Sequence, residues 1–136
     1  MKKLLLILVL AFVSNNAMAE WEVIVRSEGD TFYMDKDTIK RSGDIVKVWQ
    51  FTNLSKPMQV EVVGAVASVM GRFAYNCKEE ESQQLSGYFF KEKNGKGKQV
   101  YSFEPTAKER AEAGWMSIPR HLVVHTLMEA ACKENK

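Results

Sequence analysis

Motifs that carry enzyme chemistry are missing from this sequence of 136 residues. It contains no glycine-rich phosphate loop, no nucleophile elbow and no paired zinc-ligand motif. Its only two cysteines do not form a Cys-x-x-Cys pair, and its only two histidines are not part of a His-Glu-x-x-His motif. Because no group of residues matches a catalytic arrangement, the sequence predicts a protein that is not an enzyme and needs no cofactor.

An excess of charge of one sign is also lacking. Lys and Arg number 19 and Asp and Glu number 17, which gives a formal net charge of +2. Lys2 and Lys3 belong to the segment that we expect to be removed, so the remaining chain has 17 residues of each sign. A neutral domain has no overall field that attracts nucleic acid or anionic lipid. We therefore expect no nucleic-acid partner.

Residues 1–19 have the pattern of a secretory signal peptide, with cleavage between Ala19 and Glu20. Two lysines precede the apolar run 4–13, and small residues precede the cleavage site. The apolar run is shorter than the roughly 20 residues that span a bilayer. Glu20 stands where a lipid-anchored protein would carry a cysteine. The sequence thus predicts a single domain, 20–136, in the periplasm or secreted, without a transmembrane or lipid anchor.

The two cysteines, Cys77 and Cys132, are predicted to form a disulfide. An exported chain is exposed to an oxidising environment, and with two cysteines only one pairing exists. The bond would join the middle of the chain to its C-terminal end.

Alternation of apolar and polar residues predicts a single antiparallel sheet of about six strands. In the segment that ends at Cys77, we expect alternate residues to lie on opposite faces: Val69, Gly71, Phe73, Tyr75 and Cys77 on one, and Met70, Arg72, Ala74 and Asn76 on the other. The segment 35–38 is interpreted as a tight turn, and Pro57 is expected to end the strand that begins at Ile45. Asn94-Gly95 is typical of a hairpin turn.

Two helices are predicted after the last strand. Thr106 and Glu109 fit a capping box that begins a short helix through Ala113. A longer helix is expected within 115–132, with Pro119 in its first turn. Val124, Leu127, Met128 and Ala131 form its apolar stripe, and Cys132 lies at the edge of that stripe. The fold class is therefore α+β, with the C-terminal helix packed on one face of the sheet and tied to it by the disulfide.

His121 and His125 are the candidate metal ligands. At positions i and i+4 of the expected helix they would share a face, which is the spacing of a two-histidine metal or haem site, and Glu129 extends the line. In the alternative, both histidines flank the buried stripe and are half exposed. With so few ligands in the pattern, we assign no metal site.

Two further groups of residues are open to more than one interpretation. The four lysines Lys91, Lys93, Lys96 and Lys98 surround the expected hairpin tip, where they either bind polyanions or form a solvated turn. Aromatic side chains recur at alternating positions along the expected strands. They either belong to the core, pack on the sheet surface or form an exposed protein-binding face. They are Trp21, Trp49, Phe73, Tyr75, Phe89 and Tyr101.

The order and spacing of several short motifs resemble the surface-adhesin protein E family of Gram-negative bacteria. They are Tyr33-Met34-Asp35, Thr38-Ile39, Gly43, Val46-Lys47-Val48-Trp49, Tyr75-Asn76-Cys77, Trp115-x-x-Ile118-Pro119 and Cys132. The resemblance implies a sheet with a disulfide-linked C-terminal helix, binding of host proteins such as vitronectin and laminin, and an association with dimers and haemin. It does not carry over any ligand-binding residue.

From these observations we expect an exported, non-enzymatic binding domain. Its partner would be a host matrix or serum protein or a component of the cell envelope. The alternative is a periplasmic protein that binds a small ligand, haem or a metal through the face of His121 and His125. The oligomeric state does not follow from the sequence.

Overall fold

The computed structural model describes residues 20–134. The predicted signal peptide, 1–19, lies outside the described residues. Within 20–134, none of the helices is long and apolar enough to cross a membrane.

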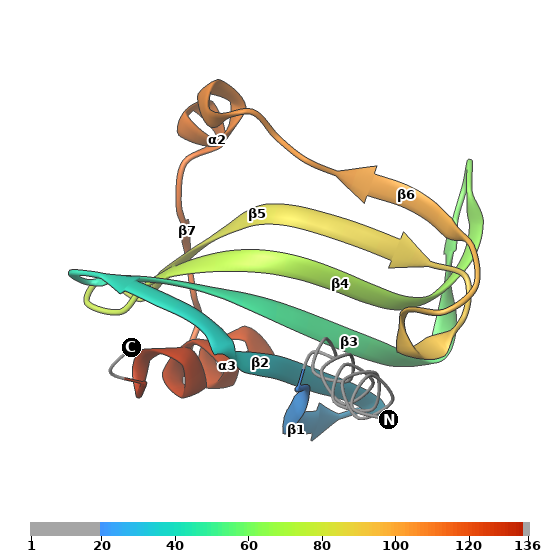
Figure 1. The fold of residues 1–136 in the computed structure, drawn as a ribbon, viewed down its shortest axis with the longest axis horizontal. Helices are drawn as coiled ribbons and strands as arrows, with labels where there is room; N and C mark the ends of the chain where they lie inside the picture. Colours follow the sequence, from blue (N-terminus) through green and yellow to red (C-terminus); the bar gives the residue numbers. More distant parts are fainter. Residues whose placement is uncertain (1–19, 135–136) are drawn as a thin grey trace, which may run out of the picture.

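A single antiparallel sheet forms most of the molecule (Figure 1). Consecutive strands pair in the order β1-β2-β3-β4-β5-β6, and a two-residue seventh strand, β7, pairs with β5. This confirms the predicted sheet and adds one short strand to it. The strands are β1 Glu22–Ser27, β2 Asp30–Ser42, β3 Ile45–Val60, β4 Gly64–Asn76, β5 Glu81–Phe90, β6 Gln99–Phe103 and β7 Met116–Ser117.

Two strands are longer than predicted because bulges replace the expected breaks. The predicted turn at 35–38 lies inside β2, where the register with β3 shifts between Asp35 and Lys40. Asp35 does accept a bond from the backbone N–H of Asp37 at 3.1 Å, but the strand resumes after it. Pro57 lies within β3, at a shift in the pairing with β4, where a missing N–H donor is tolerated.

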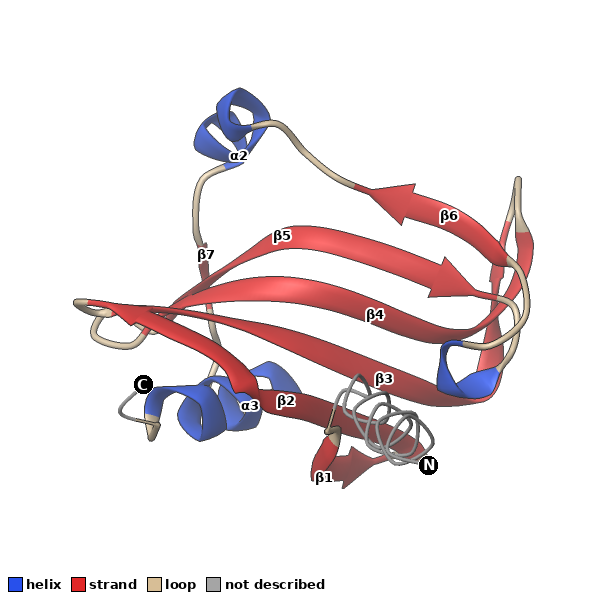
Figure 2. Ribbon diagram, viewed as in Figure 1, coloured by secondary structure: helices blue, strands red, loops and turns tan. Residues whose placement is uncertain are grey.

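Alternation along the strands decides which face of the sheet is covered. Helix α3, Val123–Cys132, packs on the face that carries the even residues of β3 and the odd residues of β4, as predicted for the segment ending at Cys77. Figure 2 shows α3 lying along the sheet, and the short 3-10 helix η1, Lys93–Gly95, at the far end of β3 and β4. The core that results is apolar and consists of Met34, Ile39, Val46, Val48, Tyr75, Ile118, Leu127, Met128 and Ala131.

The predicted start of this helix is wrong. Met116 and Ser117 form β7, and the backbone N–H of Ile118 donates to the carbonyl of Glu80 at 2.9 Å, so the chain is extended there. A turn from Pro119 to Leu122 follows, and the helix begins at Val123. Hydrogen bonding to the edge of β5 therefore outweighed the helical pattern of 115–122.

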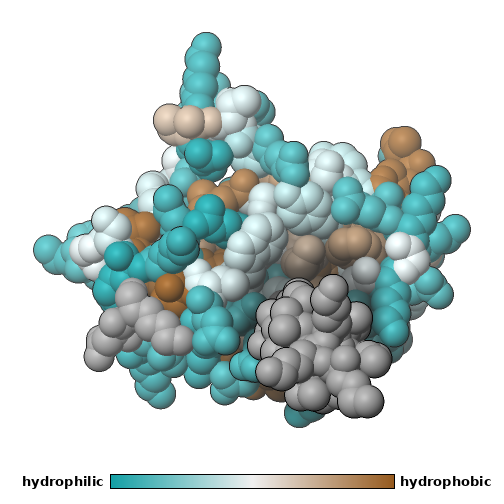
Figure 3. Space-filling model, viewed as in Figure 1, coloured by the Kyte–Doolittle hydropathy of each residue, from teal (hydrophilic) through white to brown (hydrophobic). Residues whose placement is uncertain are grey.

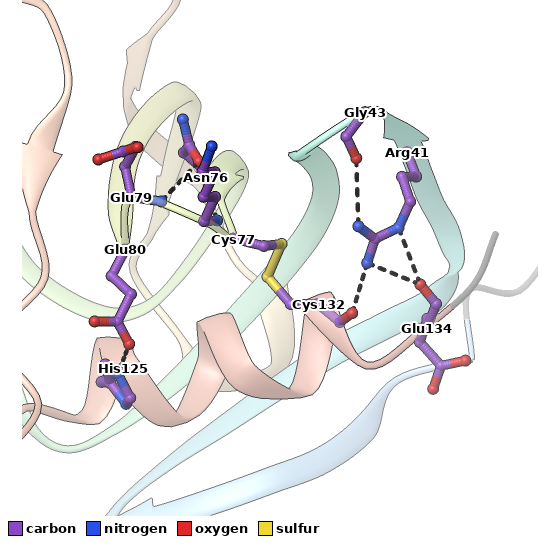
Figure 4. Close-up of a disulfide and its surroundings, with 10 residues drawn as sticks. Arg41, Gly43, Asn76, Cys77, Glu79, Glu80, His125, Cys132 and Glu134 are labelled. Carbon is purple, nitrogen blue, oxygen red and sulfur yellow. Dashed lines mark hydrogen bonds and ion pairs between the residues drawn. A yellow bond between two sulfur atoms is a disulfide. The ribbon is translucent and has the colours of Figure 1, made fainter.

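The C-terminal end of α3 is tied to the sheet. The predicted disulfide joins Cys77, just after β4, to Cys132 at the last turn of the helix (Figure 4). The Arg41 guanidinium, at the end of β2, donates to the carbonyl of Cys132 at 2.5 Å and to that of Glu134 at 3.2 Å. A cation placed on the final carbonyls of a helix satisfies unpaired acceptors and opposes the negative end of its dipole.

Helix α2, Ala107–Ala113, stands away from the sheet between β6 and β7 (Figure 1). The predicted capping box is present, with Thr106 and Glu109 each bonded to the other's backbone N–H at 3.2 Å. The side chain of Gln83, on β5, donates to the carbonyls of Arg110 and Gly114. These bonds hold the end of α2 beside β5.

Candidate binding face

The face of the sheet opposite α3 is called here the open face. Among the described residues, η1 covers one end of it and α2 borders the other, and no α-helix lies along its length. The odd residues of β3 point to it, because the even ones fill the core under α3. Antiparallel sheets tolerate one solvated face, and its residues are normally polar. On the open face these residues include aromatic rings. Exposed aromatic rings on a sheet face either pack against one another or bind a partner.

Aromatic side chains from four parts of the chain pack side by side on the open face. Trp21 and Tyr33 each contact Phe51, with ring centroids 5.6 and 5.7 Å apart. Trp49 and Tyr88 stack across β4, with centroids 6.2 Å apart and an interplanar angle of 24°. All of these except Phe51 are half-buried, so part of each ring remains accessible to a partner.

The hairpin between β5 and β6 folds over one end of this face. Asn94 and Gly95 both have positive φ, which confirms the predicted Asn-Gly turn. The side chains of Asn53 and Ser68 bond to the backbone of this turn at 2.8 and 3.0 Å. The four lysines of the hairpin are all exposed. The hairpin thus borders the open face, next to Phe51.

A cleft of about 460 Å³ lies at the other end, between the open face and α2. Its walls combine three basic residues, Lys47, Arg72 and Arg110, with three aromatic residues, Trp49, Tyr88 and Trp115. No Asp or Glu lines it. Such a cleft can hold an anionic group against an aromatic wall.

Parts of this cleft are predictable from the sequence. Trp49 is one of the aromatic candidates, and alternation along β4 places Arg72 on the correct face. Arg110 and Trp115 were missed, since only the return of the chain through β7 brings them beside β3 and β4. No local signal in the sequence marks that contact.

Val62 has the largest exposed fraction among the large apolar side chains of the described residues, ahead of Met116 at 72%. Val62, at the tip of the β3–β4 hairpin, is 94% exposed, and the hairpin is coloured hydrophobic at the upper right of Figure 3. A single exposed apolar residue is normal on a protein surface and needs no ligand to explain it.

The two histidines do not share a helix face. His121 lies in the exposed turn before α3, and His125 is buried in its first turns. The two ring nitrogens of His125 face different carboxylates, Nε2 at 3.0 Å from Glu80 and Nδ1 at 2.7 Å from Glu129. Within residues 20–134, no three His, Cys, Asp or Glu side chains are grouped to hold a metal ion. His125 links the loop after Cys77 to α3 (Figure 4).

Glu80 gives this link a dependence on pH. The hydrogen bond to His125 is the main cause that lowers the pKa of the Glu80 carboxyl, and Arg120, 3.5 Å away, lowers it further. A carboxyl whose pKa is lower in the folded state stabilises the fold above its unfolded pKa, which is about 4.3. That stabilisation is lost as the pH falls through the folded pKa.

We therefore expect Glu80→Gln to lower the melting temperature at neutral pH. The difference from the wild type should shrink as the pH falls below about 4, where the wild-type carboxyl also becomes neutral. Thermal melting followed across this pH range measures the effect. Glu79→Gln, at the exposed neighbouring position, is the matched control and should show no such convergence. A difference that stays constant with pH would contradict the linkage.

Comparisons with known proteins agree with the architecture. The family model described as surface-adhesin protein E matches residues 21–133. A search of curated proteins gave no match. Among similar solved structures, protein E from non-typeable Haemophilus influenzae is 18% identical, with a TM-score of 0.56 over 88% of this chain and 79% of that chain.

Two further structures of Haemophilus influenzae protein E give the same result. Crystal form II is 18% identical, with a TM-score of 0.60 over 87% of this chain and 91% of that chain. Another structure of the same protein is 18% identical, with a TM-score of 0.57 over 87% of both chains. Identities this low indicate a shared fold, whereas the family match covers nearly the whole described domain. The chain therefore belongs to the surface-adhesin protein E family.

Proposed function

We propose that this chain is an exported, non-enzymatic binding domain that docks a protein partner through its open face. The observation that carries the proposal is the stack of Trp49 and Tyr88 beside Arg72 on the open face, where all three side chains remain partly exposed. Tryptophan, tyrosine and arginine are the residues most enriched at the centres of protein interfaces. Family membership supports an adhesin-like role at the cell surface.

The compartment and the class of partner are part of the proposal. The pattern of residues 1–19 favours export to the periplasm or beyond, with cleavage after Ala19. The partner is a host matrix or serum protein or a component of the cell envelope. The alternative, a haem or metal protein that uses His121 and His125, has less support because one is in an exposed turn and the other is bonded through both nitrogens.

Binding of the purified domain, residues 20–136, to defined proteins tests this function. Immobilised vitronectin, laminin and purified envelope proteins of the producing cell serve as probes, with binding followed by biolayer interferometry. Trp49→Ala should weaken binding to the true partner by about tenfold or more, since truncating a central aromatic side chain commonly costs 2 kcal/mol or more. Saturable binding to at least one probe is the first requirement.

Tyr101→Ala is the matched control. Tyr101 is 51% exposed and contacts Phe89 on the α3 side of the sheet, so it is an aromatic residue of similar size away from the open face. We expect this variant to bind within about twofold of the wild type. Thermal melting of both variants separates loss of binding from loss of fold. Equal effects of the two substitutions would reject the open face as the docking site.

A further inference from the structure

The cleft beside α2 contains more positive charge than its surroundings neutralise. Lys47 projects from β3, Arg72 from β4 and Arg110 from α2, so three separate elements direct cations to one place. The domain as a whole is neutral after residues 1–19 are discounted, so this local excess is not a reflection of overall composition. Fixed cations without matching anions are a feature of sites that bind anions.

Arg72 is the central cation of the cleft. In the sheet it is paired with Trp49 of β3 on one side and with Ser86 of β5 on the other. Its side chain is half-buried and makes no hydrogen bond or ion pair with any residue of 20–134. Removing a guanidinium from water without giving it a partner is costly. A ligand with an anionic group would supply the missing partner.

The other two cations border Arg72. Arg110 donates from Nη1 to the carbonyl of Pro105 at 2.8 Å, which uses one of its five N–H donors and restrains the side chain. Lys47 is exposed and makes no ion pair with a described residue. Glu104 does not line the cleft, but its carboxylate accepts a hydrogen bond from the hydroxyl of Tyr88, which does. The positive charge of the cleft thus exceeds the negative charge that faces it.

The remaining walls favour a ligand that is partly apolar. The rings of Trp49, Tyr88 and Trp115 and the side chains of Ile45, Ala74 and Leu85 surround the basic groups. A planar guanidinium matches a carboxylate through two parallel hydrogen bonds. The apolar walls would pack against the aliphatic part of a peptide, and a densely sulfated polysaccharide has no such part.

We infer that the cleft binds an acidic segment of the protein partner, with Arg72 pairing to a carboxylate and Lys47 and Arg110 flanking it. The inference rests on the proposed function, because it names the part of the partner that enters the open face. The aromatic rings hold the apolar side chains that alternate with the acidic ones. The basic side chains would then give specificity for acidic segments, and the aromatic rings would contribute most of the affinity for the peptide.

A short fluorescein-labelled peptide of alternating glutamate and leucine is the probe, and fluorescence anisotropy measures its binding to the domain. The same peptide with glutamine in place of glutamate is the first control. We expect the acidic peptide to bind and to weaken as salt is added, and the neutral peptide to bind at least about tenfold more weakly. Labelled heparin, a sulfated polysaccharide, is tested in parallel.

Arg72→Gln removes the central charge and keeps a polar, shorter side chain at this position. Arg26→Gln, on the exposed side of β1, makes the same change of charge outside the cleft and is the matched control. Arg72→Gln should weaken binding of the acidic peptide by about tenfold or more, whereas Arg26→Gln should stay within about twofold. Unchanged melting temperatures show that both variants are folded.

Three results would overturn the inference. The first is that the acidic and neutral peptides bind equally well. The second is that the two arginine substitutions have equal effects. The third is that heparin binds through Arg72 and the acidic peptide does not bind. The proposed function fails separately, when Trp49→Ala leaves binding to every protein probe unchanged. If Trp49→Ala abolishes binding of a protein partner while the acidic peptide does not bind, the docking face stands and the acidic-segment inference is rejected.

Discussion

Replacing Cys132 with serine should lower the free energy of unfolding by about 4 kcal/mol, one of the two largest effects that we expect from a single substitution. The disulfide joins residues 55 positions apart, and a cross-link of that span removes much of the conformational entropy of the unfolded chain. It also holds α3, which is only ten residues long, against the sheet. Helices this short have little stability of their own in water.

Urea unfolding of the wild type and of Cys132→Ser measures this difference. The double variant Cys77→Ser/Cys132→Ser is the control, because it removes the bond without leaving a free thiol. Both variants and the reduced wild type should unfold at similarly lowered urea concentrations. An unchanged midpoint would show that apolar packing and the Arg41 bonds alone keep α3 in place.

Tyr75→Ala should be destabilising by a similar amount, about 3–5 kcal/mol, the range for truncating a buried aromatic ring. Tyr75 is fully buried beneath α3, and its ring stacks on Phe73 with centroids 6.5 Å apart. Its hydroxyl donates to Oε1 of the buried Gln50. The ring therefore fills the core, and the hydroxyl satisfies a polar group that has no access to water.

Tyr75→Phe separates these two contributions. It keeps the ring and leaves the Gln50 oxygen without its donor, which should cost about 1–3 kcal/mol. Burial raises the pKa of the Tyr75 hydroxyl, so the folded state resists its ionisation. Wild-type stability should fall as the pH rises above about 10, where the tyrosine ionises in the unfolded chain, and the Phe variant should lose less.

Chemical denaturation at neutral and alkaline pH measures both Tyr75 variants. The control is Tyr101→Phe, because that hydroxyl is on an exposed residue and should contribute little to stability. Equal stability of Tyr75→Phe and the wild type would show that Gln50 finds another donor. Equal stability of the Ala and Phe variants would contradict the role of the ring in the core.

Features with a local cause were predictable from the sequence. Alternation places Tyr75 and Cys77 on one face and Arg72 on the other, because successive side chains of a strand point in opposite directions. The capping box at Thr106 depends on contacts within four residues. The pairing of Cys77 with Cys132 follows from there being two cysteines in a chain expected to be exported. Each of these needs only the neighbouring sequence or a count.

The start of α3 shows where local reasoning failed. Residues 115–122 have an apolar pattern compatible with a helix, but Ser117 pairs with Glu81 of β5. The pairing satisfies backbone groups at the start of β5, which β6 does not reach and which a helix would have left unpaired. Consequently His121 lies in a turn, and the helical spacing that suggested a histidine pair does not exist.

The sequence by itself determined the sheet, its two faces, the short capped helix and the disulfide. Each depends on a local pattern or a count: alternation of apolar and polar residues, cap residues four positions apart or less, and a single pair of cysteines. Only the tertiary structure decided that Arg110 and Trp115 meet Arg72 and Trp49 in one cleft, and that both nitrogens of His125 are bonded. Those contacts join elements that are far apart in the sequence. Their geometry depends on where β7 returns to the edge of β5, which no local pattern encodes.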